Sequence, residues 1–166
     1  MTQSITAGTF ASGDNISCNG LADGSIDYTV ADGSPGYTFK WTTADGTGLV
    51  ATDEDQSGLT AGTYDVTATD INGCTMTESI TLVEPTELTN TIATTSDYNG
   101  QDISCNSAED GEAEITPTGG SAPYTYDWSN GQTSQTATGL TEGLYNVLVT
   151  DVNGCTTTNS ITMTQP

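Results

Sequence analysis

Two stretches of the chain, TATDINGCTMTESITL at residues 67–82 and LVTDVNGCTTTNSITM at residues 148–163, repeat one pattern. In both, apolar side chains alternate with polar ones on either side of an Asn-Gly pair that a cysteine follows at once. Alternation with period two predicts a β-strand with one buried face. Asn-Gly predicts a hairpin turn, because both residues tolerate positive φ. Each stretch therefore predicts two strands joined by a turn.

The repetition extends over nearly the whole chain. Residues 15–41 match residues 102–128 at constant spacing, and the first copy then carries a short acidic insertion within residues 42–56. A unit of this size can bury only a modest core. The duplication therefore predicts two small domains, residues 1–85 and 86–166, joined by a short linker.

Alternation also decides the fold class. Tyr37, Phe39 and Trp41 share one strand face, and Tyr124 and Trp128 recur at the matching places of the second copy. Aromatic residues spaced in this way favour a sandwich core over a platform for stacking sugars. Strands separated by Gly-, Asn-, Asp- and Pro-rich turns predict an all-β sandwich of about seven strands in each half.

The two ends of the chain resemble each other. Met1-Thr2-Gln3 repeats Met163-Thr164-Gln165, so the opening residues are expected to be a linker between repeats. We therefore expect the chain to be a two-repeat piece of a longer tandem array.

Charge excludes several kinds of partner. The chain has 22 acidic residues, one basic residue (Lys40), no histidine and a net charge of -21. No nucleic acid is expected to bind, because nothing can neutralise its phosphates, and anionic lipid head groups are disfavoured likewise. No stretch is apolar for long enough to span a membrane, so no direct membrane insertion is expected. An export signal is not visible and is expected to be removed or to lie outside these residues.

Several motifs together resemble a known family. These are ISCN, DGSI, GGSAPYTYDWSNG, GLTEGLYNVLVTDVNGCT and the closing SITMTQP. They resemble the SprB-type repeat, a tandem module of very large cell-surface adhesins in gliding and related bacteria, here in two copies. The resemblance implies two tandem immunoglobulin-like β-sandwich domains, export to the cell surface and a place in a long filament or adhesin. It does not imply an enzyme or prove a role in gliding.

Four cysteines, two in each half, carry the strongest chemical signal. No two of them have the Cys-x-x-Cys spacing that is typical of zinc sites. An even number of cysteines in an extracellular module favours disulfides. The preferred pairing lies within repeats, Cys18–Cys74 and Cys105–Cys155. Standard sandwich connections would place the members of each such pair at opposite ends of a domain. Either the segment NGLADG runs extended along the domain and brings Cys18 near Cys74, or the bond joins the repeats as Cys18–Cys155, which would leave Cys74 and Cys105 for flanking repeats.

Calcium is the cofactor alternative. Asp23 and Asp110 precede glycines in equivalent loops, while Asp70 and Asp151 lie beside the Asn-Gly turns. Ca²⁺ takes carboxylate and carbonyl oxygens, so these four residues are candidate ligands. None of them forms an EF-hand pattern, and the competing interpretation is that each carboxylate caps its turn by accepting backbone N–H bonds. No cofactor is required by the fold.

The sequence predicts a structural role over catalysis. Histidine, the commonest general base, is absent, and no catalytic motif is visible. The leading hypothesis is a disulfide-stabilised, acidic stalk segment of an extracellular adhesin or filament, whose partners are neighbouring copies of the repeat. The alternative is a pair of calcium-dependent modules that bind surface glycans or another surface.

Overall fold

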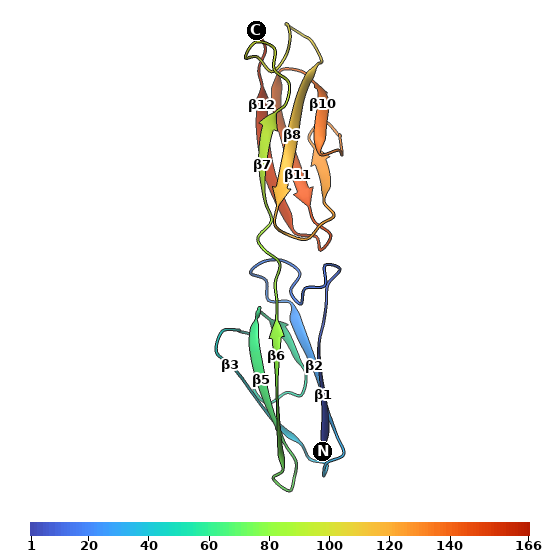
Figure 1. Ribbon diagram of the computed structural model, residues 1–166, viewed down its shortest axis with the longest axis vertical. Helices are drawn as coiled ribbons and strands as arrows, with labels where there is room; N and C mark the ends of the chain where they lie inside the picture. The colour runs from blue at the N-terminus through green and yellow to red at the C-terminus, as the bar shows by residue number, and fades with distance from the viewer. The chain divides into compact units, whose positions relative to one another are not determined.

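The segments with alternating apolar residues form strands, as predicted. The computed structural model describes residues 1–166 and contains twelve strands, β1 to β12, and no helix (Figure 1). It accordingly has no helix long and apolar enough to cross a membrane. The chain divides into two units, Met1–Pro85 and Thr86–Pro166. The all-β prediction is confirmed.

The first unit is a sandwich of two antiparallel sheets. Its strands are β1 (Thr2–Ala7), β2 (Gly24–Ala31), β3 (Thr38–Thr43), β4 (Gln56–Leu59), β5 (Gly62–Thr69) and β6 (Thr75–Leu82). One sheet has the order β1-β2-β4 and the other β3-β5-β6. The side chains of β2 alternate strictly between buried and exposed, as a half-buried sheet requires.

The second unit repeats this topology. Its strands are β7 (Thr89–Thr94), β8 (Gly111–Thr118), β9 (Thr125–Trp128), β10 (Thr136–Leu140), β11 (Gly143–Thr150) and β12 (Thr156–Met163). The sheets have the orders β10-β8-β7 and β12-β11-β9. The duplicated sequence therefore encodes one architecture twice.

The aromatic residues on the alternating strands face the core, which agrees with the core interpretation. Trp41 and Trp128 are buried, and Tyr37, Phe39 and Tyr124 are partly buried against the same clusters. The indole N–H of Trp41 donates to the Asp53 carbonyl at 2.8 Å. An aromatic ring buries a large apolar area, which stabilises a small sandwich, and its polar atom costs little when it is hydrogen-bonded.

A tyrosine near the start of β5 and β11 indicates the immunoglobulin type of sandwich. The Tyr64 hydroxyl donates to the Thr60 carbonyl at 2.8 Å, and the Tyr145 hydroxyl donates to the Thr141 carbonyl at 3.2 Å. A hydroxyl that bonds back to the backbone a few residues upstream at this corner is a hallmark of that fold.

Two details of the sequence prediction were wrong. Each unit has six strands rather than about seven, and in the first unit the acidic insertion forms loops between β3 and β4. In addition, the opening residues are not a linker. Thr2–Ala7 is β1, and it pairs with β2 in the same way as β7 pairs with β8. The likeness of Met1–Gln3 to Met163–Gln165 is therefore not a structural equivalence.

Candidate functional site

Each unit presents one cysteine in a loop at the end where the chain leaves the sandwich. We call residues 15–23 and 102–110 the exit loops. In the first, the side-chain amide of Asn19 donates to the Pro85 carbonyl at 3.1 Å, and the Gly20 N–H donates to Glu84 at 2.7 Å. Cys18 therefore lies beside the segment that follows β6.

The exit loop of the second unit has the same construction. The Ser107 N–H donates to the Gln165 side chain at 3.0 Å, at the place that Gly20 and Glu84 occupy in the first unit. Residue 107 also takes positive φ, as Gly20 does. Cys105 therefore lies beside the segment that follows β12, as Cys18 does for β6.

The other cysteine of each unit lies in a turn at the opposite end. We call residues 70–74 and 151–155 the entry turns. The Gly120 N–H donates to the Thr86 carbonyl at 2.8 Å, and the neighbouring Ser121 N–H donates to Asp151 at 2.9 Å. The second entry turn therefore lies where the chain begins its unit.

In the first unit the entry turn lies at the corresponding place. The Ser34 N–H donates to Asp70 at 3.3 Å, and the Thr2 hydroxyl donates to Asp32, just before that loop, at 2.9 Å. The entry turn that carries Cys74 is thus beside the start of β1.

Each entry turn joins two antiparallel strands, as Asn-Gly predicted, but Asn72 and Asn153 do not take positive φ. Only the glycines, Gly73 with φ 85° and Gly154 with φ 90°, take positive φ. The strands pair last at Thr69 and Thr75, so five residues form the first connection. Its extra length is stabilised by the aspartate that opens the turn.

All four aspartates proposed as calcium ligands support a cysteine-bearing loop. Asp151 accepts backbone N–H bonds from Asn153, Cys155 and Ser121, each at 2.9 Å. Asp70 does the same for Asn72 and Cys74, both at 2.9 Å. The Cys74 and Asn72 N–H groups thereby hold the pKa of Asp70 below its ordinary value, despite the partial burial that opposes this.

The exit loops are supported in the same way. Asp23 accepts the backbone N–H of Ser17 at 3.1 Å and also its hydroxyl. Asp110 accepts the Ser104 N–H at 3.2 Å. Bonds from Ser104, chiefly from its hydroxyl, lower the pKa of Asp110. These carboxylates act as turn caps, and no group of three or more acidic, cysteine or histidine side chains that could hold a metal occurs in the structure.

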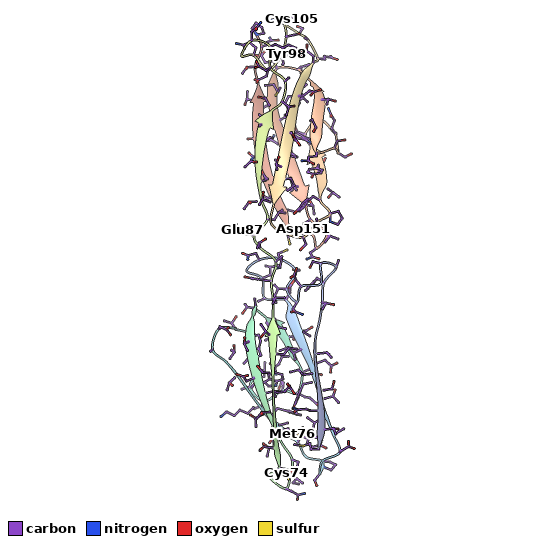
Figure 2. All side chains as sticks on the ribbon, in the orientation of Figure 1. Cys74, Met76, Glu87, Tyr98, Cys105 and Asp151 are labelled. Carbon is purple, nitrogen blue, oxygen red and sulfur yellow. The ribbon has the colours of Figure 1, made fainter.

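The preferred disulfides within repeats are not formed. Cys74 and Cys105 are exposed free thiols, whereas Cys18 and Cys155 are each disulfide-bonded. In each unit the last strand, eight residues long, separates the two cysteines. Such a strand spans about 25 Å, and bridged cysteines need Cα atoms within about 7 Å. Figure 2 shows Cys105 and Asp151, which opens the turn of Cys155, at opposite ends of the second unit.

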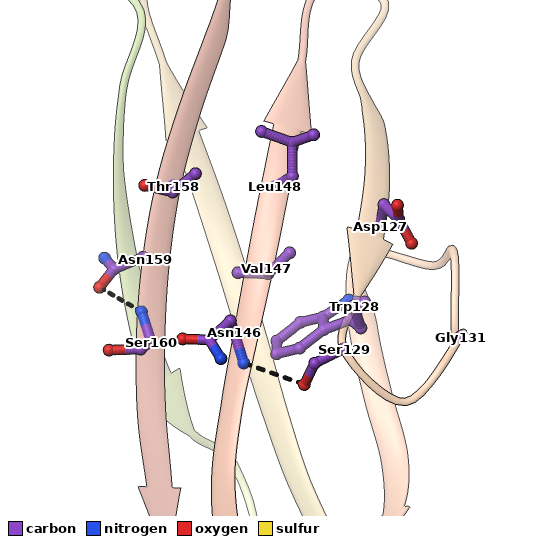
Figure 3. A pocket seen from close by; sticks show the side chains of 10 residues that line it. All are labelled: Asp127, Trp128, Ser129, Gly131, Asn146, Val147, Leu148, Thr158, Asn159 and Ser160. Atoms are coloured by element: carbon purple, nitrogen blue, oxygen red, sulfur yellow. Dashed lines mark hydrogen bonds between the residues drawn. The ribbon is translucent and has the colours of Figure 1, made fainter.

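A surface hollow of about 910 Å³ was not predicted. It lies on the outer face of β9, β11 and β12 (Figure 3). The Asn146 N–H donates to the Ser129 hydroxyl at 3.1 Å, and the Ser160 N–H donates to the Asn159 side chain at 2.8 Å. Five of its ten lining residues are neutral and polar, three are apolar and one, Asp127, is acidic, whereas both Asp65 and Glu78 line the matching hollow of about 380 Å³ in the first unit. Alternation marks these side chains only as solvent-facing, so no sequence signal distinguished them.

The class that these observations define is a tandem pair of immunoglobulin-like sandwiches with a cysteine at each end of each unit. The family model described as SprB repeat matches the chain twice, at residues 11–46 and 98–133. One match falls in each unit, in agreement with the two SprB-type copies that the sequence predicted. No curated protein matches the chain.

One solved structure supports the fold class. A C-terminal 282-residue fragment of intimin, solved in complex with the intimin-binding domain of the translocated intimin receptor, is similar with a TM-score of 0.52 and 19% identity. The match covers 97% of this chain and 63% of that one. Fibronectin(III)-like modules of Clostridium thermocellum CbhA match at a TM-score of 0.38 and 13% identity, covering 98% of this chain and 94% of theirs.

Proposed function

We propose that this chain is a structural, adhesive repeat segment of a long extracellular surface protein or filament. The observation that carries the proposal is that each SprB-type unit receives the chain at its entry turn and releases it at its exit loop, at the opposite end. Units built in this way can be joined in series without a crossover. In this role the chain has no catalytic function.

The charge supports the same role. With 22 acidic residues against one basic residue, neighbouring units repel each other. Mutual repulsion opposes collapse of an array onto itself and lateral sticking between arrays. It would also favour solubility at a cell surface.

We further propose that Cys18 and Cys155 bond to each other, which is the alternative the sequence left open. Cys18 lies beside Pro85, the last residue of the first unit, and Cys155 lies in the turn beside Thr86, the first residue of the second. Both cysteines therefore flank the same peptide bond of the linker. A bond between them would limit the freedom of successive repeats.

The test uses native material from the source cells. An antibody raised against these 166 residues would label intact cells and detect, on a reduced denaturing gel, a polypeptide far larger than the 17.1 kDa of this chain. Labelling of lysed cells only, together with a reduced band at 17.1 kDa, would reject a tandem surface protein.

The alternative, a calcium-dependent pair that binds surface glycans, has one supporting observation. Neutral amides and hydroxyls line the hollow on the second unit (Figure 3), and such groups bind sugar hydroxyls. The calcium part has less support, because backbone N–H groups already occupy the carboxylate oxygens of Asp70 and Asp151. Calorimetric titration with Ca²⁺ and then with a glycan panel decides it: saturable heat supports this alternative, and its absence removes it.

A further inference from the structure

Two exposed thiols remain after the disulfide-bonded cysteines are accounted for. They are Cys74 in the first entry turn and Cys105 in the second exit loop. Sequence repetition makes Cys105 the counterpart of Cys18 and Cys74 the counterpart of Cys155. Each free thiol is therefore the repeat equivalent of a cysteine that is already bonded.

The backbone around each free thiol matches that of its bonded counterpart. In the exit loops, the Leu21 N–H donates to the Cys18 carbonyl at 3.1 Å, and the Ala108 N–H donates to the Cys105 carbonyl at 3.0 Å. Cys105 is thus held in a loop of the same construction as that of Cys18.

The entry turns agree equally well. The Cys74 N–H donates to Asp70 and the Cys155 N–H donates to Asp151, both at 2.9 Å. The return bonds, from the aspartate N–H to the cysteine carbonyl, are also 2.9 Å in both turns. Because the aspartate fixes the cysteine backbone before any bond forms, Cys74 needs little further ordering to react.

We propose that Cys105 and Cys74 are covalent junctions to further repeats. Cys105 bonds the entry-turn cysteine of the repeat that follows, and Cys74 bonds the exit-loop cysteine of the repeat that precedes. This inference rests on the proposed tandem function. The adjoining repeat can belong to the same polypeptide or to a second copy of this chain, since the recognising thiol is the same.

The junction forms by thiol–disulfide exchange with an external disulfide such as oxidised glutathione. One protein thiolate attacks a glutathione sulfur, which gives a mixed disulfide and releases one glutathione thiolate. The second protein thiolate then attacks the protein sulfur of that mixed disulfide and releases the second glutathione. The two protein thiols lose two protons and two electrons in all, and the glutathione disulfide gains the electrons.

The test mixes two single variants of the full chain, C74S and C105S, in a glutathione redox buffer. Each variant keeps one of the two junction thiols, and both substitutions fall on exposed side chains. The expected product of the mixture is a heterodimer of twice 17.1 kDa on a non-reducing gel, whereas each variant alone stays monomeric. The wild-type chain is expected to form a ladder that collapses on reduction, and the C74S/C105S double variant is expected to form none.

Peptide mapping identifies the bond. Lys40 is the only site for trypsin, so a Glu-specific protease is used, and a Cys74–Cys105 cross-linked peptide is expected by mass spectrometry. Dimers of C74S alone or C105S alone, as abundant as those of the mixture, would overturn the proposal by showing unselective oxidation. A mixture that stays monomeric would overturn it equally.

Ionic strength gives a second readout. Two chains of charge -21 repel each other, so the rate of heterodimer formation is expected to rise with added salt. The outcomes separate the two proposals. A reduced native band at 17.1 kDa with a selective heterodimer rejects the tandem polypeptide and keeps the junction. A long native polypeptide with no heterodimer keeps the array and rejects the junction.

Discussion

Asp70 and Cys74 hold each other across the entry turn of the first unit. The Cys74 N–H donates to the Asp70 carboxylate, and the Asp70 N–H donates to the Cys74 carbonyl, both at 2.9 Å. Asp151 and Cys155 repeat the pair with the same distances. The residue that suggested a metal ligand is thus the one that positions a cysteine.

Removing the carboxylate of Asp151 is expected to destabilise the second unit. D151A leaves the Asn153, Cys155 and Ser121 N–H groups without their acceptor at a position that is only 5% exposed. A buried donor without a partner costs about 1–3 kcal/mol, so we expect a loss of about 2–3 kcal/mol, since part of the turn can reach water. Urea unfolding followed by Trp128 fluorescence measures it.

The matched control is D127A, which removes an exposed aspartate of the same unit. Its effect is expected to stay within about 0.5 kcal/mol. Equal urea midpoints for D151A and D127A would show that the cap contributes nothing.

Stability is expected to pass through a maximum as the pH falls. Protonation first reduces the repulsion of a chain with net charge -21, which raises the melting temperature in low salt. The pKa values of Asp70, Asp102 and Asp110 lie below the ordinary 3.8 in the folded protein, because each carboxylate accepts hydrogen bonds. Their contribution is complete above that value and is lost as the pH falls through the folded pKa values.

Salt separates the two contributions to this pH profile. At high ionic strength the rise is expected to vanish while the fall below about pH 3.8 remains. D102N, which weakens the bonds that Thr164 donates at 2.8 and 2.7 Å, is expected to flatten the fall. A melting temperature independent of pH between 6 and 2 would contradict the assignment of these carboxylates.

Each unit has its own tryptophan, so the two unfolding transitions can be observed separately. W128F removes the indole N–H that donates to the Ser134 carbonyl at 2.9 Å in the core of the second unit. We expect a cost of about 1–3 kcal/mol there, while W128A costs about 3–5 kcal/mol. Trp41 is the only indole left in these variants, so its fluorescence follows the first unit, whose urea midpoint is expected to stay unchanged, while far-UV circular dichroism reports the earlier unfolding of the second unit.

Gly111 has no room for a side chain. An added Cβ would lie 2.9 Å from the Leu140 carbonyl oxygen and 2.9 Å from the terminal methyl of Met163. G111A is therefore expected to cost about 1–3 kcal/mol by overpacking, which lowers the melting temperature by about 4–8 °C per kcal/mol in a domain of this size. E112A, one residue along on the exposed face, serves as the control and is expected to change little. A G111A melting temperature equal to that of E112A would contradict the overpacking.

Much of the fold could be predicted, because its determinants are local. Alternation placed Tyr37, Phe39 and Trp41 on one face, and all three lie in or against the core of the first unit. Duplication then doubled every such signal. The number of strands was less accessible, because residues in the acidic insertion have strand propensity but form only isolated bonds to a strand, such as that from the Trp41 N–H to the Ala51 carbonyl at 3.0 Å. The side-chain amide of Gln56 accepts the Val50 N–H at 2.9 Å and donates to the Val50 carbonyl at 3.0 Å. It thus takes the place that a neighbouring strand would have in a sheet.

The cysteine chemistry was only partly predictable. Cys18 and Cys74 are the two cysteines of one repeat, which made them the obvious pair, but the length of β6 holds them at opposite ends of the unit. That separation depends on the end of the sandwich at which each loop lies, and this is decided by the order and direction of the strands. The role of the aspartates was also ambiguous, since a carboxylate that caps a turn and one that binds a cation have the same short signature.

The parallel course of β1 and β6 has a mechanical consequence. Gln3 on β1 donates to the Thr77 carbonyl on β6 at 3.0 Å, and both strands run from the entry end of the unit to the exit end. A pulling force applied at the two ends of a unit acts along these strands. It loads the Gln3 contact with β6 and the ladder between β1 and β2 in shear, so that the paired residues of Thr2–Ala7 must give way together, whereas force across the strands would peel them apart singly. A stalk of such units would resist stretching without any enlargement of its small cores.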